Sequence, residues 1–267
     1  MPRVSARGTE LHYERAGSGE PLLLIQGMSG THVAWGEPFK GALEESFDVV
    51  AFDNRGIGLS ERTSEPFTIA EMAEDTAALL DELGWESAHV LGISMGGMIA
   101  QELALAHAGL LRSLTLGCTY CGGPGSELMP QENAEKLLAA LSSGDRDQAI
   151  RAGYEVNLSP AFRADEDTFA AFHEMATSVP AARDIIQLQL QAIVGHDTSG
   201  RLGDVATPAL IIHGTVDGVL PYANGEQIAR LMPDARFETL EDVGHMFWWE
   251  QPQRSAELVR EHALAVA

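Results

Sequence analysis

The stretch HVLGISMGGMIAQELAL, residues 89–105, changes from a buried-strand pattern to a helical pattern at Ser94. HVLGI is a continuous apolar run, and MGGMIAQELALAH has the spacing of a helix. Glycines lie two residues before and two residues after Ser94. A sharp strand-to-helix turn strains its central residue, and side chains at the two flanking positions would collide with neighbouring elements. We therefore predict that the turn lifts the Ser94 hydroxyl clear of the sheet and points a helix N-terminus at it.

Other apolar runs predict a parallel sheet covered by helices on both faces. The runs are short and continuous, as in strands buried on both sides, and helical segments alternate with them. The predicted strands are 22–25, 47–52, 89–93, 113–117 and 209–212, and the predicted helices are 69–83, 95–106, 224–231 and 253–264. Residues 3–17 alternate in polarity and predict a hairpin before the first buried strand.

The pattern changes between residue 122 and about residue 205. Strand-like runs vanish there, and helical periodicity takes over between the turn-rich segments GGPG and TSGRLGDVATP. The return of a buried strand at residue 209 favours an insertion over a separate helical domain. We therefore predict a core made of residues 1–121 and 206–267, with residues 122–205 as an inserted helical cap.

Composition excludes some classes of function. The 39 acidic and 17 basic residues give a formal charge of -22, which repels nucleic acids. No apolar run approaches the roughly 18 residues of a membrane helix, and the first ten residues hold no signal-like apolar core. We therefore expect a cytoplasmic protein with no nucleic-acid or membrane partner, and we leave a homo-oligomer open.

Cys118 and Cys121 form a C-T-Y-C pair whose surroundings fit neither zinc binding nor redox chemistry. A zinc site needs two further ligands, and a reactive pair is usually followed by a helix N-terminus, whereas GGPG follows here. We therefore interpret both as structural thiols, and we expect no metal and no cofactor.

Two downstream segments supply partners for Ser94. ALIIHGTVDGVLP places Asp217 just beyond a predicted strand, and DVGHMFWWEQP places His245 in a loop after the strand-like RFETL. A serine hydroxyl attacks a carbonyl usefully only if a base takes its proton, which is the role expected of His245. Asp217 would hold the imidazole tautomer, and the backbone N–H groups of Met28 and Met95 would form an oxyanion hole.

Together these motifs resemble the α/β-hydrolase superfamily over nearly the whole chain. The resemblance rests on 92–97 (GISMGG), on 53–60 (DNRGIGLS), on 214–217 (GTVD) and on Gly244-His245 followed by Glu250 and Pro252. It implies an α/β-hydrolase fold, with a mostly parallel sheet of about eight strands and a helical cap. The order Ser94, Asp217, His245 agrees with that family. Family members often have His-Gly where this chain has Gln26-Gly27, which leaves the orientation of that loop open.

The surroundings of Ser94 look most like capped esterases and lactonases, including 3-oxoadipate enol-lactonases. The expected function is a serine hydrolase that cleaves small or medium carboxylic esters or lactones through an acyl-enzyme. The alternatives are a meta-cleavage C–C bond hydrolase, a cofactor-free haloperoxidase or perhydrolase, and a ligand-binding receptor with weak hydrolysis. Haloalkane dehalogenases and epoxide hydrolases of this superfamily are excluded, because they have an aspartate at the position of Ser94.

Several other residues have competing interpretations. Asp53 and Arg55 are expected to hold a loop in shape, and His213 to fill a turn. Trp248 and Trp249 are expected to pack the last helix rather than line the pocket. The weaker candidates for the acid are Asp197, Asp204 and Asp242. The cap has aromatic and methionine side chains at helical spacing, interpreted first as the core of the cap and second as pocket lining: Met129, Tyr154, Phe162, Phe169, Phe172 and Met175.

Overall fold

The computed structural model describes residues 2–179 and 181–266, which form an eight-stranded sheet. The strands are β1 (Arg3–Ala6), β2 (Thr9–Gly17), β3 (Glu20–Ile25), β4 (Phe47–Phe52), β5 (Ala88–Ile93), β6 (Leu111–Gly117), β7 (Ala209–Gly214) and β8 (Ala235–Leu240). Their order in the sheet is β1-β2-β4-β3-β5-β6-β7-β8. Strands β3 to β8 pair in parallel, and β1 and β2 run antiparallel to their neighbours. The predicted hairpin and mostly parallel sheet are confirmed.

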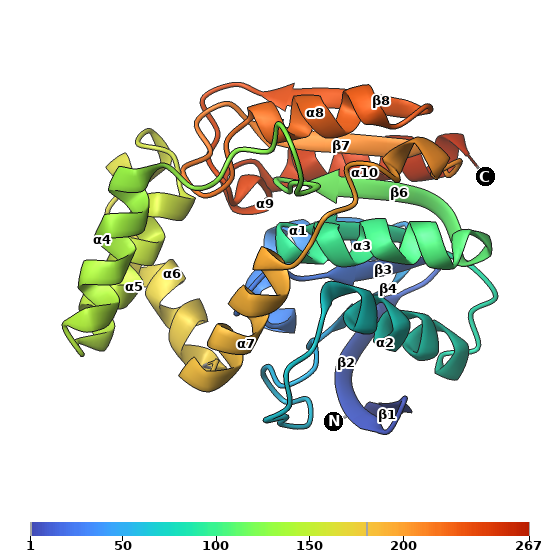
Figure 1. The fold of residues 1–267 in the computed structure, drawn as a ribbon, viewed down its shortest axis with the longest axis horizontal. Coiled ribbons are helices and arrows are strands. Elements are labelled where there is room, and N and C mark those ends of the chain that lie inside the picture. Colours follow the sequence, from blue (N-terminus) through green and yellow to red (C-terminus); the bar gives the residue numbers. More distant parts are fainter. Residues whose placement is uncertain (1, 180, 267) are drawn as a thin grey trace.

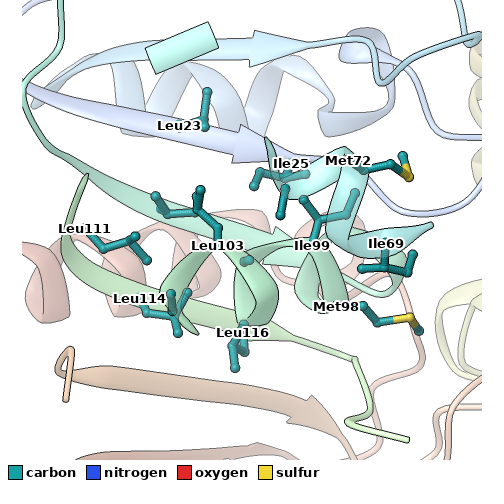
Figure 2. Packing of buried hydrophobic residues seen from close by; sticks show 14 of the residues in the cluster. Leu23, Ile25, Ile69, Met72, Met98, Ile99, Leu103, Leu111, Leu114 and Leu116 are labelled. Carbon is teal, nitrogen blue, oxygen red and sulfur yellow. The ribbon is translucent and has the colours of Figure 1, made fainter. Parts of the chain in front are cut away.

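Helices cover both faces of this sheet (Figure 1). Helices α2 (Ile69–Glu82), α3 (Met95–Ala106) and α8 (Ala223–Leu231) pack on one face, and α1 (Glu37–Glu44) and α10 (Pro252–Ala265) on the other. Neighbouring side chains of a strand point to opposite faces, so a continuous apolar run is buried on both sides. In β3, Leu23 and Ile25 join the cluster with α2 and α3, whereas Leu22 and Leu24 join the opposite cluster. Figure 2 shows Ile25 of β3 near Ile99 of α3.

Four helices lie between β6 and β7 in the chain. They are α4 (Gln131–Ser142), α5 (Arg146–Asn157), α6 (Asp167–Ser178) and α7 (Arg183–Val194). Figure 1 shows this group beyond the end of the sheet to which the arrow of β6 points. Parallel strands end at one edge of a sheet, so these helices lie at the edge where the loops carrying Ser94, Asp217 and His245 begin.

The sequence patterns did not predict α1 or the single turn α9 (Phe247–Glu250). Helix α1 has only two turns and carries Pro38 and Gly41, both residues of low helix propensity. The remaining short turns are 3-10 helices: η1 (His32–Trp35), η2 (Ala108–Leu110), η3 (Phe162–Ala164) and η4 (Leu202–Asp204). In the described part of the chain, no helix has both the length and the apolar character needed to cross a membrane.

Candidate active site

Ser94 lies at the junction of β5 and α3 with φ 52° and ψ -123°, so the expected backbone strain is present. The flanking glycines are required by space. A Cβ at Gly92 would lie 2.2 Å from the carbonyl oxygen of Gly96, and a Cβ at Gly96 would lie 2.0 Å from that of Ile25. The Ser94 side chain makes no capping hydrogen bond with its own helix. The turn therefore leaves the hydroxyl free for another partner.

The loop after β3 lies directly against Ser94. A Cβ at Gly27 would lie 2.9 Å from the Cβ of Ser94 and 3.4 Å from its Oγ. Met28 is the residue that follows Gly27 in this loop. Met95 begins α3, where N–H groups have no acceptor within the helix. Both backbone groups proposed for the oxyanion hole are thus in segments that meet at Ser94.

Gln26 braces this loop from inside. Its buried side chain accepts a hydrogen bond from the backbone N–H of Gly27 at 3.1 Å, and its Oε1 would be 2.6 Å from a Cβ at Gly30. From α7, the buried Gln189 accepts a hydrogen bond from the N–H of Ser29 at 2.9 Å. The sequence left the orientation of this loop open, because Gln26 stands where related proteins often have histidine. In the structure, two amide side chains hold the loop.

Asp217 and His245 form a buried pair. The Nδ1 of His245 lies 2.7 Å from the Oδ2 of Asp217, and the second oxygen accepts hydrogen bonds from the N–H groups of Val219 and Leu220 at 2.8 and 2.9 Å. Burial tends to raise the pKa of Asp217. The charge of His245 and hydrogen bonds from two histidines outweigh burial and hold the pKa of this carboxyl well below its usual range. Asp217 is therefore an ionised acceptor.

His213 is the second histidine on this carboxylate, which the sequence analysis did not foresee. Its Nε2 lies 3.1 Å from the Oδ2 of Asp217 and 2.9 Å from the carbonyl oxygen of Leu220. Both atoms are acceptors, so Nε2 carries the proton and donates. The spacing of four residues between His213 and Asp217, across the end of β7, is the only signal of this contact in the sequence.

Helix α5 and the residues that follow it hold the loop of His245 on both sides. The Oε1 of Glu250 accepts hydrogen bonds from the N–H of Gly244 at 3.0 Å and from the N–H of Ser159 at 2.8 Å. The N–H of Met246 donates to the carbonyl oxygen of Asn157 at 3.1 Å. Since Asn157 ends α5, the backbone before and after His245 is tied to the helices inserted between β6 and β7.

The competing residues occupy structural positions. Asp53 accepts hydrogen bonds from the N–H groups of His32 and Leu59, and Arg55 forms a two-bond ion pair with Asp75, so both hold loops as expected. Both cysteines are buried free thiols whose pKa is raised by burial. Among the described residues, the carboxylate that hydrogen-bonds to His245 comes from Asp217, and none of the weaker acid candidates makes this bond.

Trp248 and Trp249 both pack against a neighbouring segment of the chain and line a cavity. Both indole N–H groups donate to the carbonyl oxygen of Ala34 at 2.9 Å. Both also line a cavity of about 640 Å³ between α6 and the segment around η1. Ser94 is not among its lining residues: Val33, Trp35, Gly36, Glu37, Pro38, Ala171, Glu174, Met175, Ser178, Trp248, Trp249 and Pro252. Met175 lines this cavity and also packs against the hydrophobic core, whereas the ring of Tyr154 contacts those of Phe169 and Phe172 edge-on.

Comparison with known proteins agrees with this geometry. The chain is 31% identical over 249 residues to a protein of Azorhizobium caulinodans named "Putative carbamate hydrolase RutD", covering 92% of each chain. The solved enol-lactonase of Burkholderia xenovorans LB400 superposes with a TM-score of 0.85 at 25% identity, covering 99% of this chain and all of that one. A thermophilic esterase from Thermogutta terrifontis superposes with a TM-score of 0.82 at 25% identity, covering 99% of this chain and 98% of the other. A family model for the alpha/beta hydrolase fold matches residues 20–252, and with it the chain belongs to the α/β-hydrolase family.

Proposed function

We propose that the chain is a serine hydrolase that cleaves small or medium carboxylic esters or lactones through an acyl-enzyme. The observation that carries the proposal is the 2.7 Å hydrogen bond between His245 and the buried Asp217, at the same sheet edge as the strained turn of Ser94. A histidine fixed by a carboxylate at Nδ1 presents its Nε2 as a base. Ser94, on a turn that exposes its hydroxyl, is the nucleophile that this base serves.

The reaction follows from these roles. As the Oγ of Ser94 attacks the carbonyl carbon, His245 takes the hydroxyl proton, and Asp217 stabilises the imidazolium that forms. The N–H groups of Met28 and Met95 bind the oxyanion of the tetrahedral intermediate. His245 then gives its proton to the leaving alkoxide, which leaves an acyl-enzyme. A water molecule that loses its proton to His245 releases the acid and restores Ser94.

The cap supports a substrate of modest size. It contains an aromatic group in which the ring of Tyr154 contacts those of Phe169 and Phe172 edge-on. The ring centroids of Phe172 and Trp249, near the His245 loop, are 6.1 Å apart. Apolar walls with few polar groups suit an acyl chain or a lactone ring. We propose residues 122–205 as this cap. The names of the relatives agree in part, since they include an esterase, an enol-lactonase and a carbamate hydrolase.

A fluorophosphonate probe tests the proposal directly. We expect the probe to label Ser94 of the wild type and to leave folded Ser94→Ala and His245→Ala unlabelled. The substrate class follows from a panel of p-nitrophenyl esters of increasing acyl length, an enol-lactone, a carbamate and a vinylogous diketone. Preference for the diketone would assign C–C bond hydrolysis instead. A folded wild type that neither reacts with the probe nor turns over any substrate would support a receptor.

A further inference from the structure

Three side chains with metal-ligating atoms gather outside the proposed triad, at β2 and η1. His12 and Glu14 are two residues apart on β2 and so point to the same face of the sheet, and His32 begins η1. One ligand atom from each lies within 4.8 Å of the other two. The Nε2 of His32 is 3.6 Å from the Oε1 of Glu14. Ligand atoms around a tetrahedral zinc are about 3.4 Å apart, given metal–ligand bonds of about 2.1 Å.

Each histidine has its other ring nitrogen occupied by an acceptor. The Nδ1 of His12 lies 3.1 Å from the carbonyl oxygen of Pro2, and the Nδ1 of His32 lies 2.9 Å from the Oδ1 of Asp53. Carbonyl and carboxylate oxygens only accept, so both Nδ1 atoms carry protons, and each Nε2 presents a lone pair when its ring is neutral. A carbonyl or carboxylate behind each imidazole is the usual support of a metal-bound histidine.

The Nε2 of His12 is a buried atom that a bound ion could satisfy. His12 is 1% exposed, and within residues 2–179 and 181–266 its Nε2 has no hydrogen-bond partner. Leaving a buried polar atom unpaired is costly, and such atoms are rare in folded proteins. A cation bound between His12, Glu14 and His32 satisfies this atom and uses the lone pair that the contact with Pro2 leaves free.

From these observations we infer that His12, Glu14 and His32 form a binding site for a divalent transition-metal ion such as Zn²⁺. Two imidazoles and one carboxylate are a donor set that suits zinc and its neighbours and not calcium or magnesium. Access comes through Glu14, which is half exposed and lines a surface cavity of about 280 Å³ with Pro2 and Lys40. The ion would connect β2 with η1, the turn that follows the loop carrying Met28.

Lys40 competes with the ion for Glu14. Its ammonium lies 3.2 Å from the Oε2 of Glu14, and it also contacts Glu37 and Glu44 at 3.3 and 3.7 Å. The His32 contact is made by the other oxygen, Oε1, so the carboxylate can face both cations at a reduced affinity for the metal. Substitutions of the two residues should therefore have opposite effects on the affinity for the metal: removing Lys40 strengthens binding, whereas removing the charge of Glu14 weakens it.

Calorimetric titration of the chelator-treated, dialysed protein with Zn²⁺ tests the site without any use of hydrolysis. We expect one saturable ion per chain and a rise in melting temperature on binding. Glu14→Gln should weaken the affinity at least tenfold, and Lys40→Gln should strengthen it. Glu74→Gln is the matched control, because Glu74 pairs with a histidine elsewhere on the surface, His107, and its loss should leave the affinity unchanged.

Cobalt titration adds a spectroscopic signature. Bound Co²⁺ should give visible d–d absorption that is lost in Glu14→Gln and in His12→Gln. Because Glu14 is half exposed, its variant should fold even if a substitution at the buried His12 does not. The inference fails if the folded wild type takes up no saturable Zn²⁺, or if Glu14→Gln binds it with wild-type affinity. Either outcome leaves the hydrolase proposal intact, since none of the three ligands belongs to the proposed triad.

Discussion

His213 and His245 bind the same oxygen of one carboxylate, the Oδ2 of Asp217, at 3.1 and 2.7 Å. Two backbone N–H groups, of Val219 and Leu220, bind the other oxygen. The carboxylate is therefore fixed in position before it orients the base, and each of the four donors favours its ionised form. We therefore expect a rigidly held carboxylate, and its side-chain donors can be removed one at a time by substitution.

Asp217→Asn should lower kcat by about 10³- to 10⁴-fold. An amide at this position can donate to Nδ1 and so favours the wrong tautomer of His245, with little change in shape. Steady-state kinetics on the best p-nitrophenyl ester measure this loss. Asp242→Asn is the matched control, since Asp242 is an exposed acid near His245 in sequence and should keep wild-type kcat. Equal activity in the two variants would remove Asp217 from the mechanism.

His213→Phe should lower kcat by about tenfold with KM nearly unchanged. The variant removes one donor from the ionised Asp217. A hydrogen bond to a charged group contributes roughly 1.5–3 kcal/mol, and the lower end of this range corresponds to about tenfold in rate. His213→Gln retains an N–H donor and should recover most of the rate. If both variants lose the same activity in proportion to a loss of folded protein, the role of His213 is packing alone, which circular dichroism and kinetics together would reveal.

Glu250→Ala should lower kcat/KM by about tenfold, because it frees the backbone at Gly244 from Ser159 and so loosens the position of His245. Glu250→Gln keeps a carbonyl oxygen for both N–H groups and should recover to within about threefold. Glu257→Ala on α10 removes an exposed glutamate and serves as the control. A wild-type kcat/KM in folded Glu250→Ala would show that the contact of Glu250 with Ser159 does not position the base.

The sequence predicted those parts of the fold and site that depend on local pattern. LLLI in β3 must be apolar because its side chains are buried on both faces of the sheet. The positions on either side of Ser94 must be glycine because any side chain there would collide with the backbone of Gly96 or Ile25. Asp217 and His245 could be found because each follows a strand of a parallel sheet. The proposed roles of all these residues still await experiment.

Contacts between distant segments could not be read from the sequence. Glu250 accepts a hydrogen bond from Ser159, 91 residues away in the chain, and no periodicity of the sequence indicates this contact. His12, Glu14 and His32 lack the spacing of a known metal motif, because β2 and η1 meet only through the packing of the sheet edge. Such pairings depend on the angles and side-chain directions of packed elements, which a single sequence does not specify.

His196 should make the protein less stable as the pH falls from 6.5 to 4. Burial lowers the pKa of His196 to about 4. The charge of Arg201 adds to this lowering, and the charges of Glu102 and Asp197, which raise the pKa, do not restore it. A histidine with a lowered pKa in the folded state stabilises the fold fully above its unfolded pKa of 6.5, and this stability is lost as the unfolded chain takes up the proton. The shift corresponds to roughly 3 kcal/mol of unfolding free energy.

Urea unfolding at pH 7, 5.5 and 4 measures this loss. His196→Phe replaces a ring whose two nitrogens have no hydrogen-bond partner among the described residues. The unfolding free energy of this variant should therefore lack the decrease with falling pH that His196 causes. His196→Leu covers the case in which the phenyl ring overpacks the site beside Tyr120. His173→Gln is the control, because His173 is partly exposed and should follow the wild type. If the unfolding free energy of the wild type and of both His196 variants fell equally with pH, the burial of His196 would not contribute to the pH dependence of stability.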